Sequence, residues 1–103
     1  MSEKIDLWKE QVAEDPENEL ARFSLAQAYF AEKDWGNALS QYEEALARKP
    51  DWMMATILRG QCLIKLGRID EAKATLLEGR ALAVKQNHKD PQMEIDEILE
   101  ELG

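Results

Sequence analysis

The chain has 103 residues, of which 45% are hydrophobic and 33% are charged. This length fits one domain with a single hydrophobic core, and the hydrophobic content excludes a disordered chain. Acidic residues outnumber basic ones by 21 to 13, and the resulting net charge of −8 repels a phosphate backbone, so a nucleic-acid partner is not expected.

The lack of a recognisable targeting signal and the single cysteine predict a cytoplasmic protein. The first residues lack the apolar core of a signal peptide, and no stretch approaches the roughly 18 apolar residues of a membrane span. The single cysteine, Cys62, excludes an internal disulfide and agrees with a reducing compartment. We therefore expect a cytoplasmic location and no membrane partner.

Hydrophobic periodicity and end signals predict six helices, at residues 3–14, 17–32, 35–48, 51–66, 69–86 and 91–102. The second is expected to begin after the N-cap Asp15, with Pro16 at the first helical position, where its missing N–H had no helical partner. The fourth stops at Gly67, which takes the left-handed conformation without steric cost. The sixth follows Asp90 and places its acidic residues away from an apolar stripe, as expected of a helix that caps the end of a stack.

The sequence also repeats itself at an offset of 34 residues, the length of one helix-turn-helix repeat unit. Identical pairs at this offset include Gln27 and Gln61, Ala38 and Ala72, and Glu44 and Glu78. At other positions with this offset, such as Tyr29 and Leu63, the two residues are both large and apolar, as a core position would require. An array of similar helical pairs is therefore predicted.

Residues 19–52 carry the tetratricopeptide pattern of fixed small, aromatic and proline positions. The matching residues are Leu25, Ala26, Tyr29, Ala38, Tyr42, Ala45 and Pro50. Residues 53–86 keep the pattern more loosely, at Gly60, Leu63, Ala72, Leu76 and Gly79. The chain thus resembles the tetratricopeptide repeat family, in particular its short bacterial-type members.

The resemblance implies an all-α fold of antiparallel helix-turn-helix repeats, stacked as a short right-handed α-solenoid of about six helices. One domain, 1–103, would contain four parts. These are an orphan N-terminal helix in 1–16, repeat one in 19–52, repeat two in 53–86 with an elongated second helix, and a C-terminal capping helix in 90–103.

The elongation is inferred from the prolines. Pro16 and Pro50 are 34 residues apart, whereas Pro91 follows Pro50 by 41, an excess of seven residues or about two helical turns. Helix 69–86 is expected to overrun the family length by about this amount, because its end contains one glycine and no proline. The alternative is a loop of the same length.

By resemblance to the family, the first helix of each repeat lines a concave face along which peptides lie. The matching positions are Leu20, Phe23, Gln27, Phe30 and Ala31 in the first repeat and Met54, Ile57, Gln61, Ile64 and Lys65 in the second. This mostly apolar strip would bind an extended or helical peptide, with the two glutamines bonding its backbone. In the alternative interpretation, the strip is core or the last helix covers it.

Chaperone-binding members of the family hold a peptide's terminal carboxylates with a clamp of Lys and Asn. At the matching positions this chain has Phe23, Gln27, Ile57 and Gln61, so the clamp is absent. Chaperone tails are therefore not expected as ligands.

The inventory of catalytic groups is thin. His88 is the only histidine and lies in a predicted loop, and Cys62 falls where the family prefers a small buried residue. The acidic terminus, 94–101, has the spacing of a solvated helical face. Arg59 stands at a usual Leu position and is expected to reach water and pair with a glutamate such as Glu43 or Glu44, with anion binding as the alternative.

The sequence therefore predicts no enzyme activity, no catalytic residue, no metal and no cofactor. The three tryptophans are interpreted as packing residues. The hypothesis favoured is a protein-protein interaction module, a scaffold or adaptor that presents an apolar groove to a peptide or partner protein. The alternative is a structural protein whose functional form is a homo-oligomer, assembled through the groove or the terminal helices.

Overall fold

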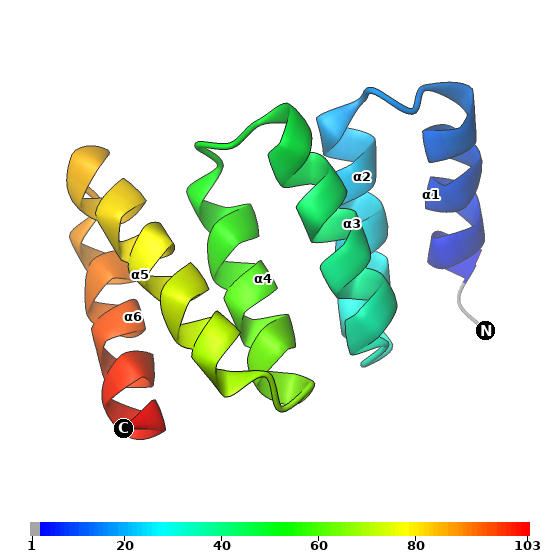
Figure 1. Ribbon diagram of the computed structural model, residues 1–103. Helices are drawn as coiled ribbons and strands as arrows, with labels where there is room; N and C mark the ends of the chain where they lie inside the picture. Colours follow the sequence, from blue (N-terminus) through cyan, green and yellow to red (C-terminus); the bar gives the residue numbers. More distant parts are fainter. Residues whose placement is uncertain (1–2) are drawn as a thin grey trace. The chain divides into compact units, whose positions relative to one another are not determined.

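The computed structural model describes residues 3–103, and these form six helices (Figure 1). They are α1 (Glu3–Glu14), α2 (Glu19–Ala31), α3 (Trp35–Arg48), α4 (Met53–Lys65), α5 (Ile69–Lys85) and α6 (Lys89–Leu102). Met1 and Ser2, which belong to the predicted N-terminal segment 1–16, lie outside the described residues. From residue 3 onward the chain contains only helices and their connections, which confirms the all-α prediction.

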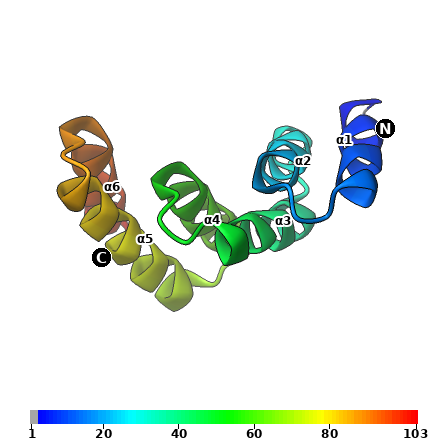
Figure 2. The same ribbon diagram turned by 90° about the horizontal axis from the view of Figure 1, so that it is seen from above.

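The chain divides after Pro50 into two compact units. In the first unit α2 packs against both α1 and α3, and in the second α5 packs against both α4 and α6. Figure 2 shows α5 and α6 side by side in the second unit. Within residues 3–103, no helix combines the length and apolar character that crossing a bilayer requires.

Small residues bring the helices of the first unit close together. Ala26, Ala38 and Ala45 are fully buried, and the ring of Tyr42 is buried among these helices. Because an alanine leaves room for a neighbouring backbone, the aromatic ring can fill the remaining space at normal packing density. The core of this unit is built on that contrast of sizes.

In the second unit, Ile57, Leu76 and Ile95 form the centre of the core. Around them pack the partly buried side chains of Met53, Ile64, Ile98, Leu99 and Leu102. Helix α6 therefore contributes its apolar stripe to the core, while its acidic residues lie mostly exposed on its other faces. Arg80 on α5 also pairs with Asp96 on α6, at 2.6 Å between Nε and Oδ1.

Three helices end in the same turn. A residue with positive φ follows the end of α2, α4 and α5, namely Lys33 (61°), Gly67 (77°) and Asn87 (61°). After each, the next residue donates its N–H to the carbonyl five positions back, at 3.0 Å from Asp34 to Tyr29, for example. This is the Schellman arrangement, which satisfies carbonyls left open at a helix end. The prediction that Gly67 ends its helix is confirmed.

Three predicted helix starts are wrong by two residues, and one of them is that of α4, which begins at Met53 rather than at residue 51. Helix α2 begins after Asn18, whose Oδ1 accepts from the N–H groups of Leu20 and Ala21 at 3.0 and 3.2 Å. Asp15 instead accepts the N–H of Asn18 through its carbonyl, which makes a turn before the helix. Asn18 is the better cap because its side chain reaches two amides that have no helical partner.

Helix α6 begins two residues earlier than predicted, after His88 rather than Asp90. The Schellman turn at Asn87 leads directly into the helix, which puts Asp90 and Pro91 in its first turn. Proline is tolerated there because first-turn N–H groups have no helical acceptor. The prediction, which relied on Pro91, therefore placed the start of α6 two residues too late.

The predicted overrun of α5 is also wrong in size. Helix α3 has 14 residues and α5, which starts 34 residues later, has 17, so the excess is three rather than seven. The rest of the proline spacing arises because Pro16 and Pro50 precede α2 and α4, whereas Pro91 lies inside α6. The alternative of a seven-residue loop is equally excluded.

Candidate ligand-binding site

An open pocket of about 320 Å³ lies between α1 and α2 in the first unit. Its lining residues are Lys4, Trp8, Phe23, Ser24, Gln27, Ala28 and Ala31. Three of them, Phe23, Gln27 and Ala31, belong to the strip predicted from the first repeat. Because they recur on α2 at a spacing of four, they lie along one face of that helix.

Tyr42 on α3 contacts two of these side chains, Gln27 and Phe23. Its hydroxyl donates a hydrogen bond to Oε1 of Gln27 at 3.1 Å. Its ring meets the ring of Phe23 edge to face, with 5.6 Å between centroids and 65° between planes. Tyr42 itself is completely buried, so the packing of the core fixes its position. The aromatic wall of the pocket is therefore supported by the core.

The hydrogen bond also determines what Gln27 offers to a ligand. An amide side chain has one oxygen acceptor and one nitrogen with two donors. Tyr42 occupies one lone pair of the oxygen, and no bond from Nε2 to another described residue is present, so this exposed side chain keeps both of its donors.

The other two predicted residues of the first repeat lie outside this lining. Leu20 is exposed near the start of α2. Phe30 is half-buried, and its ring meets Trp35 and Tyr42 edge to face, at centroid distances of 5.0 and 6.4 Å. Phe30 therefore supports the packing of α2 on α3, and Trp35 acts there as the packing residue that the sequence predicted.

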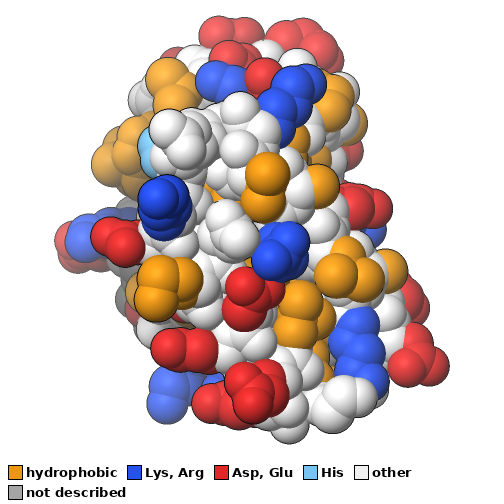
Figure 3. All heavy atoms as spheres, turned by 90° about the vertical axis from the view of Figure 1, so that its left-hand side faces the viewer, with side chains coloured by type: hydrophobic (Ala, Val, Ile, Leu, Met, Phe, Trp, Pro, Cys, Tyr) orange, Lys and Arg blue, Asp and Glu red, His pale blue; other side chains and the backbone are white. Residues whose placement is uncertain are grey.

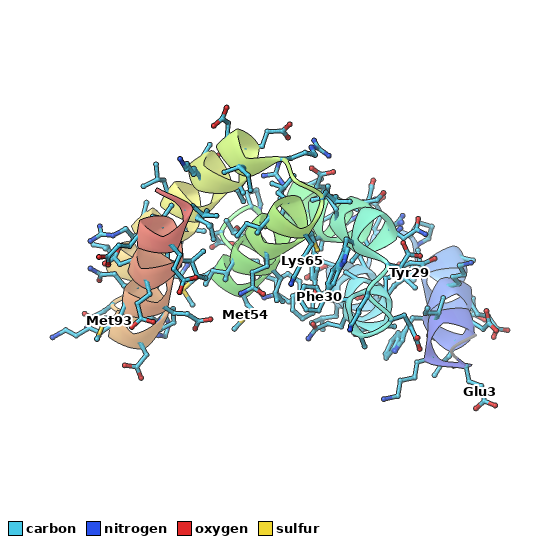
Figure 4. The ribbon with its side chains drawn as sticks, turned by 90° about the horizontal axis from the view of Figure 1, so that it is seen from below. Glu3, Tyr29, Phe30, Met54, Lys65 and Met93 are labelled. Atoms are coloured by element: carbon cyan, nitrogen blue, oxygen red, sulfur yellow. The ribbon has the colours of Figure 1, made fainter. Side chains whose placement is uncertain are left out.

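In the second unit the predicted strip is divided between surface and core. Met54 and Lys65 are exposed on α4 (Figure 4). Gln61 on the same helix is half-buried. Ile57 is only 4% exposed and packs with Leu76 and Ile95, while Ile64 packs against the same cluster. The side chain of Ile57 thus belongs to the core of its unit, in agreement with the alternative interpretation for this residue.

Electrostatics distinguish the pocket from the rest of this acidic chain. Among its seven lining residues, Lys4 is the only charged one. Elsewhere, the hydrogen bond from Arg68 lowers the pKa of Glu71, and the Coulombic attraction of Arg59 adds to that effect. Burial raises the pKa of the Cys62 thiol from 9.0 to about 11, so the folded state favours the neutral thiol. Glu71 and Cys62, whose pKa values are shifted, both lie outside the pocket.

Helix α1 supplies the pocket residues that were not predicted as site residues. Lys4 and Trp8 come from this helix, and Ser24 and Ala28 from α2. The ligand positions taken from the family lie on the first helix of each repeat, which excludes α1. A signal was nevertheless available, because Trp8 precedes Tyr42 by the 34-residue offset. Within the described part of the chain, no cluster of three or more metal-binding side chains is present.

The family comparison matches residues 6–79 to the model described as Anaphase-promoting complex, cyclosome, subunit 3. Among curated proteins, the chain is 29% identical over 75 residues to the Heat shock protein sti1 homolog of Schizosaccharomyces pombe. That alignment covers 73% of this chain but only 13% of the relative. The match thus represents one small part of a longer protein.

Two solved structures show the same fold. The TPR2B domain of yeast Sti1, solved as a complex with pHsp70, has a TM-score of 0.85 at 19% identity, with 95% of this chain and 78% of that chain covered. The first TPR of Spaghetti (RPAP3), bound to the HSP90 peptide SRMEEVD, has a TM-score of 0.75 at 26% identity, with 92% and 76% covered.

Proposed function

The chain belongs to the tetratricopeptide repeat family that the matched model represents, and we propose that it is a protein-interaction module whose first unit binds a peptide segment in the pocket between α1 and α2. In this role the module serves as a scaffold or adaptor, and the pocket is one part of the predicted apolar groove. Support comes from the RPAP3 domain, which is similar to this chain and was solved with a peptide bound.

One observation carries the proposal: the hydrogen bond between Tyr42 and Gln27. It holds a polar side chain in a fixed orientation inside a pocket with two aromatic walls, Trp8 and Phe23. Ligand sites commonly combine an apolar lining with a few fixed polar groups. The Gln27 amide would then cost little entropy to order when a ligand binds.

The lining determines the chemistry of the ligand. An apolar side chain would fill the space between Trp8 and Phe23, and a backbone carbonyl would accept from Nε2 of Gln27. Phe23 and Gln27 occupy positions where chaperone-binding relatives carry the clamp. We therefore propose that the ligand is an internal apolar segment rather than an acidic chain terminus.

The proposal is tested by selecting peptides from a random display library on the whole immobilised protein and measuring the affinity of an enriched peptide by fluorescence anisotropy. Phe23→Glu should weaken binding at least about tenfold, because it places a charge in the apolar wall. Gln27→Leu, which keeps the size but removes the donor, should weaken it about fivefold.

Lys65→Ala, an exposed change on α4, is the control outside the pocket, and it should leave the affinity unchanged if the first unit alone is the site. Equal affinity of the wild type and Phe23→Glu would contradict the proposal. The HSP90 peptide SRMEEVD, which the RPAP3 domain binds, should show no binding above background.

The alternative, a homo-oligomer assembled through the groove or the terminal helices, finds some support in the exposed apolar face of α5, the helix that packs against the terminal helix α6. Leu77 and Val84 are 56% and 52% exposed, whereas the residues 34 positions earlier are Glu43 and Pro50. Figure 3 shows hydrophobic side chains among charged ones on the side of the second unit formed by α5 and α6. Exposed apolar area of this kind is often an interaction surface.

Sedimentation velocity over a hundredfold concentration range separates the two functions. A stable dimer that Leu77→Glu dissociates would favour assembly through α5. If the protein sediments as a monomer throughout the range, the homo-oligomer alternative fails.

A further inference from the structure

A second pocket lies on another side of α2, between α1 and the start of α3. Its volume is about 430 Å³, and its lining comprises Ile5, Asp6, Lys9, Tyr29, Glu32, Asp34 and Asn37. It shares no lining residue with the pocket described above. All three contributing elements belong to the first unit, so the pocket is defined within that unit.

The hydroxyl of Tyr29 is the first feature that points to a ligand. Tyr29 is only 8% exposed, and its ring lies in the space between α2 and α1 (Figure 4). Across residues 3–103, no protein group forms a hydrogen bond with this hydroxyl, and its oxygen is not among the buried side-chain atoms without a partner. The ring of this pocket-lining residue is therefore held in the packing, while its hydroxyl stays accessible to a ligand.

Charge is the second feature. The lining contains three carboxylates, Asp6, Glu32 and Asp34, against one ammonium group, Lys9. The Asp34 carboxylate already caps α3, since it accepts from the N–H of Asn37 and from its Nδ2 at 3.4 and 2.8 Å. Asp6 and Glu32 form no ion pair within the described chain, so both are available to a cation.

We propose that this pocket binds the guanidinium group of an arginine side chain presented by a partner protein. Asp6 and Glu32 would accept from its N–H groups, and the Tyr29 hydroxyl would accept a further one. Arginine fits better than lysine because its planar donors reach several acceptors at once, and its weakly hydrated plane can lie against the Tyr29 ring and Ile5. Lys9 opposes the bound cation.

The probe is the tripeptide amide acetyl-Gly-Arg-Gly, whose blocked ends leave the guanidinium as its only charge, titrated into the ¹⁵N-labelled full chain at low salt. We expect saturable amide shifts confined to residues 5–9 and 29–37. The same peptide with citrulline, which keeps the shape of arginine without its charge, should produce no shift in that range.

Four variants distinguish the pocket from diffuse attraction to an acidic protein. Asp6→Asn should raise the dissociation constant about fivefold, whereas Glu14→Gln, which removes one charge from the same helix outside the pocket, should leave it unchanged. Tyr29→Phe should raise it about threefold. Lys9→Ala should lower it about threefold, an effect that loss of structure would not produce.

Three outcomes would overturn the proposal. They are equal shifts with the citrulline peptide or with acetyl-Gly-Lys-Gly amide, shifts spread over the acidic surface, and equal losses of affinity in Asp6→Asn and Glu14→Gln. A thermal melt of each variant checks folding. If Tyr29→Phe is destabilised, the opposite effects of Asp6→Asn and Lys9→Ala still decide the question. The apolar-peptide test on Phe23 uses other residues, so the two proposals can fail independently.

Discussion

Tyr42 connects the core to the proposed peptide pocket through a single hydroxyl. Tyr42→Phe keeps the ring that packs on Phe23 but removes the hydrogen bond to Gln27. Because Gln27 is exposed, its oxygen can then bond to water, so the free energy of unfolding should fall by only about 0.5–1.5 kcal/mol. Peptide affinity should fall as well, since Gln27 loses its fixed orientation. Urea melts and anisotropy together check this, and unchanged affinity would show that Tyr42 does not orient the site.

Two glycines offer a matched test of packing. A Cβ added at Gly60 would lie 2.8 Å from Cδ2 of the fully buried Leu76, so Gly60→Ala should destabilise the protein by about 1–3 kcal/mol. At Gly36 nothing lies within 4 Å of an added Cβ. Gly36→Ala, in the first turn of α3, should stabilise by up to about 1 kcal/mol because alanine loses less backbone entropy. Thermal melts that move both variants in the same direction would contradict this packing.

At this scale the sequence predicted the residues of the pocket only in part. Phe23, Gln27 and Ala31 were carried over from the ligand-facing positions of the family that the sequence resembles. Trp8 and Lys4 were not, because the family's ligand positions lie on the first helix of each repeat, whereas these two residues reach the pocket through the packing of α1 on α2. Ile57 was misjudged for a similar reason: its apolar character suits a ligand and a core equally well, and contact with Ile95 decides between them.

The caps of helix α2 provide a test at the level of secondary structure. Asn18→Ala removes the acceptor for two amides and should cost about 1 kcal/mol of stability. Asp15→Ala keeps the carbonyl that forms the turn and should cost much less, because its side chain caps nothing. Chemical denaturation of both variants checks the difference. Equal losses would restore Asp15 as a contributor to the helix start.

The limits of prediction for the helices have a single physical origin. The bounds of α1 and α3 agree with the periodicity of their apolar residues. The starts of α2, α4 and α6 were wrong because proline is compatible both with the residues before a helix and with its first turn. Only the turn geometry, set by Asn18 and Asn87, selects between those positions.

For the whole molecule, the buried thiol predicts how stability depends on pH. The pKa of Cys62 is raised by burial from 9.0 to about 11, so the folded state favours the neutral thiol. The unfolded chain loses this proton near pH 9, and the stabilising effect is therefore complete below pH 9 and is lost as the pH rises from 9 to 11. Cys62→Ala should lack this component. Urea melts of both proteins between pH 8 and 10.5 check the difference in slope, and parallel curves would exclude it.

The three Schellman turns show which part of a repeat can lose its sequence signal without losing its shape. Lys33, Gly67 and Asn87 adopt the same left-handed backbone, although the three share no side-chain chemistry. The strain of about 1–2 kcal/mol at a lysine is partly offset, relative to glycine, by the smaller entropy that lysine loses on folding. The residue type at these positions can therefore change at a small cost in stability. Divergent copies of this unit will be aligned more reliably by their buried alanines than by the residues at which the chain reverses.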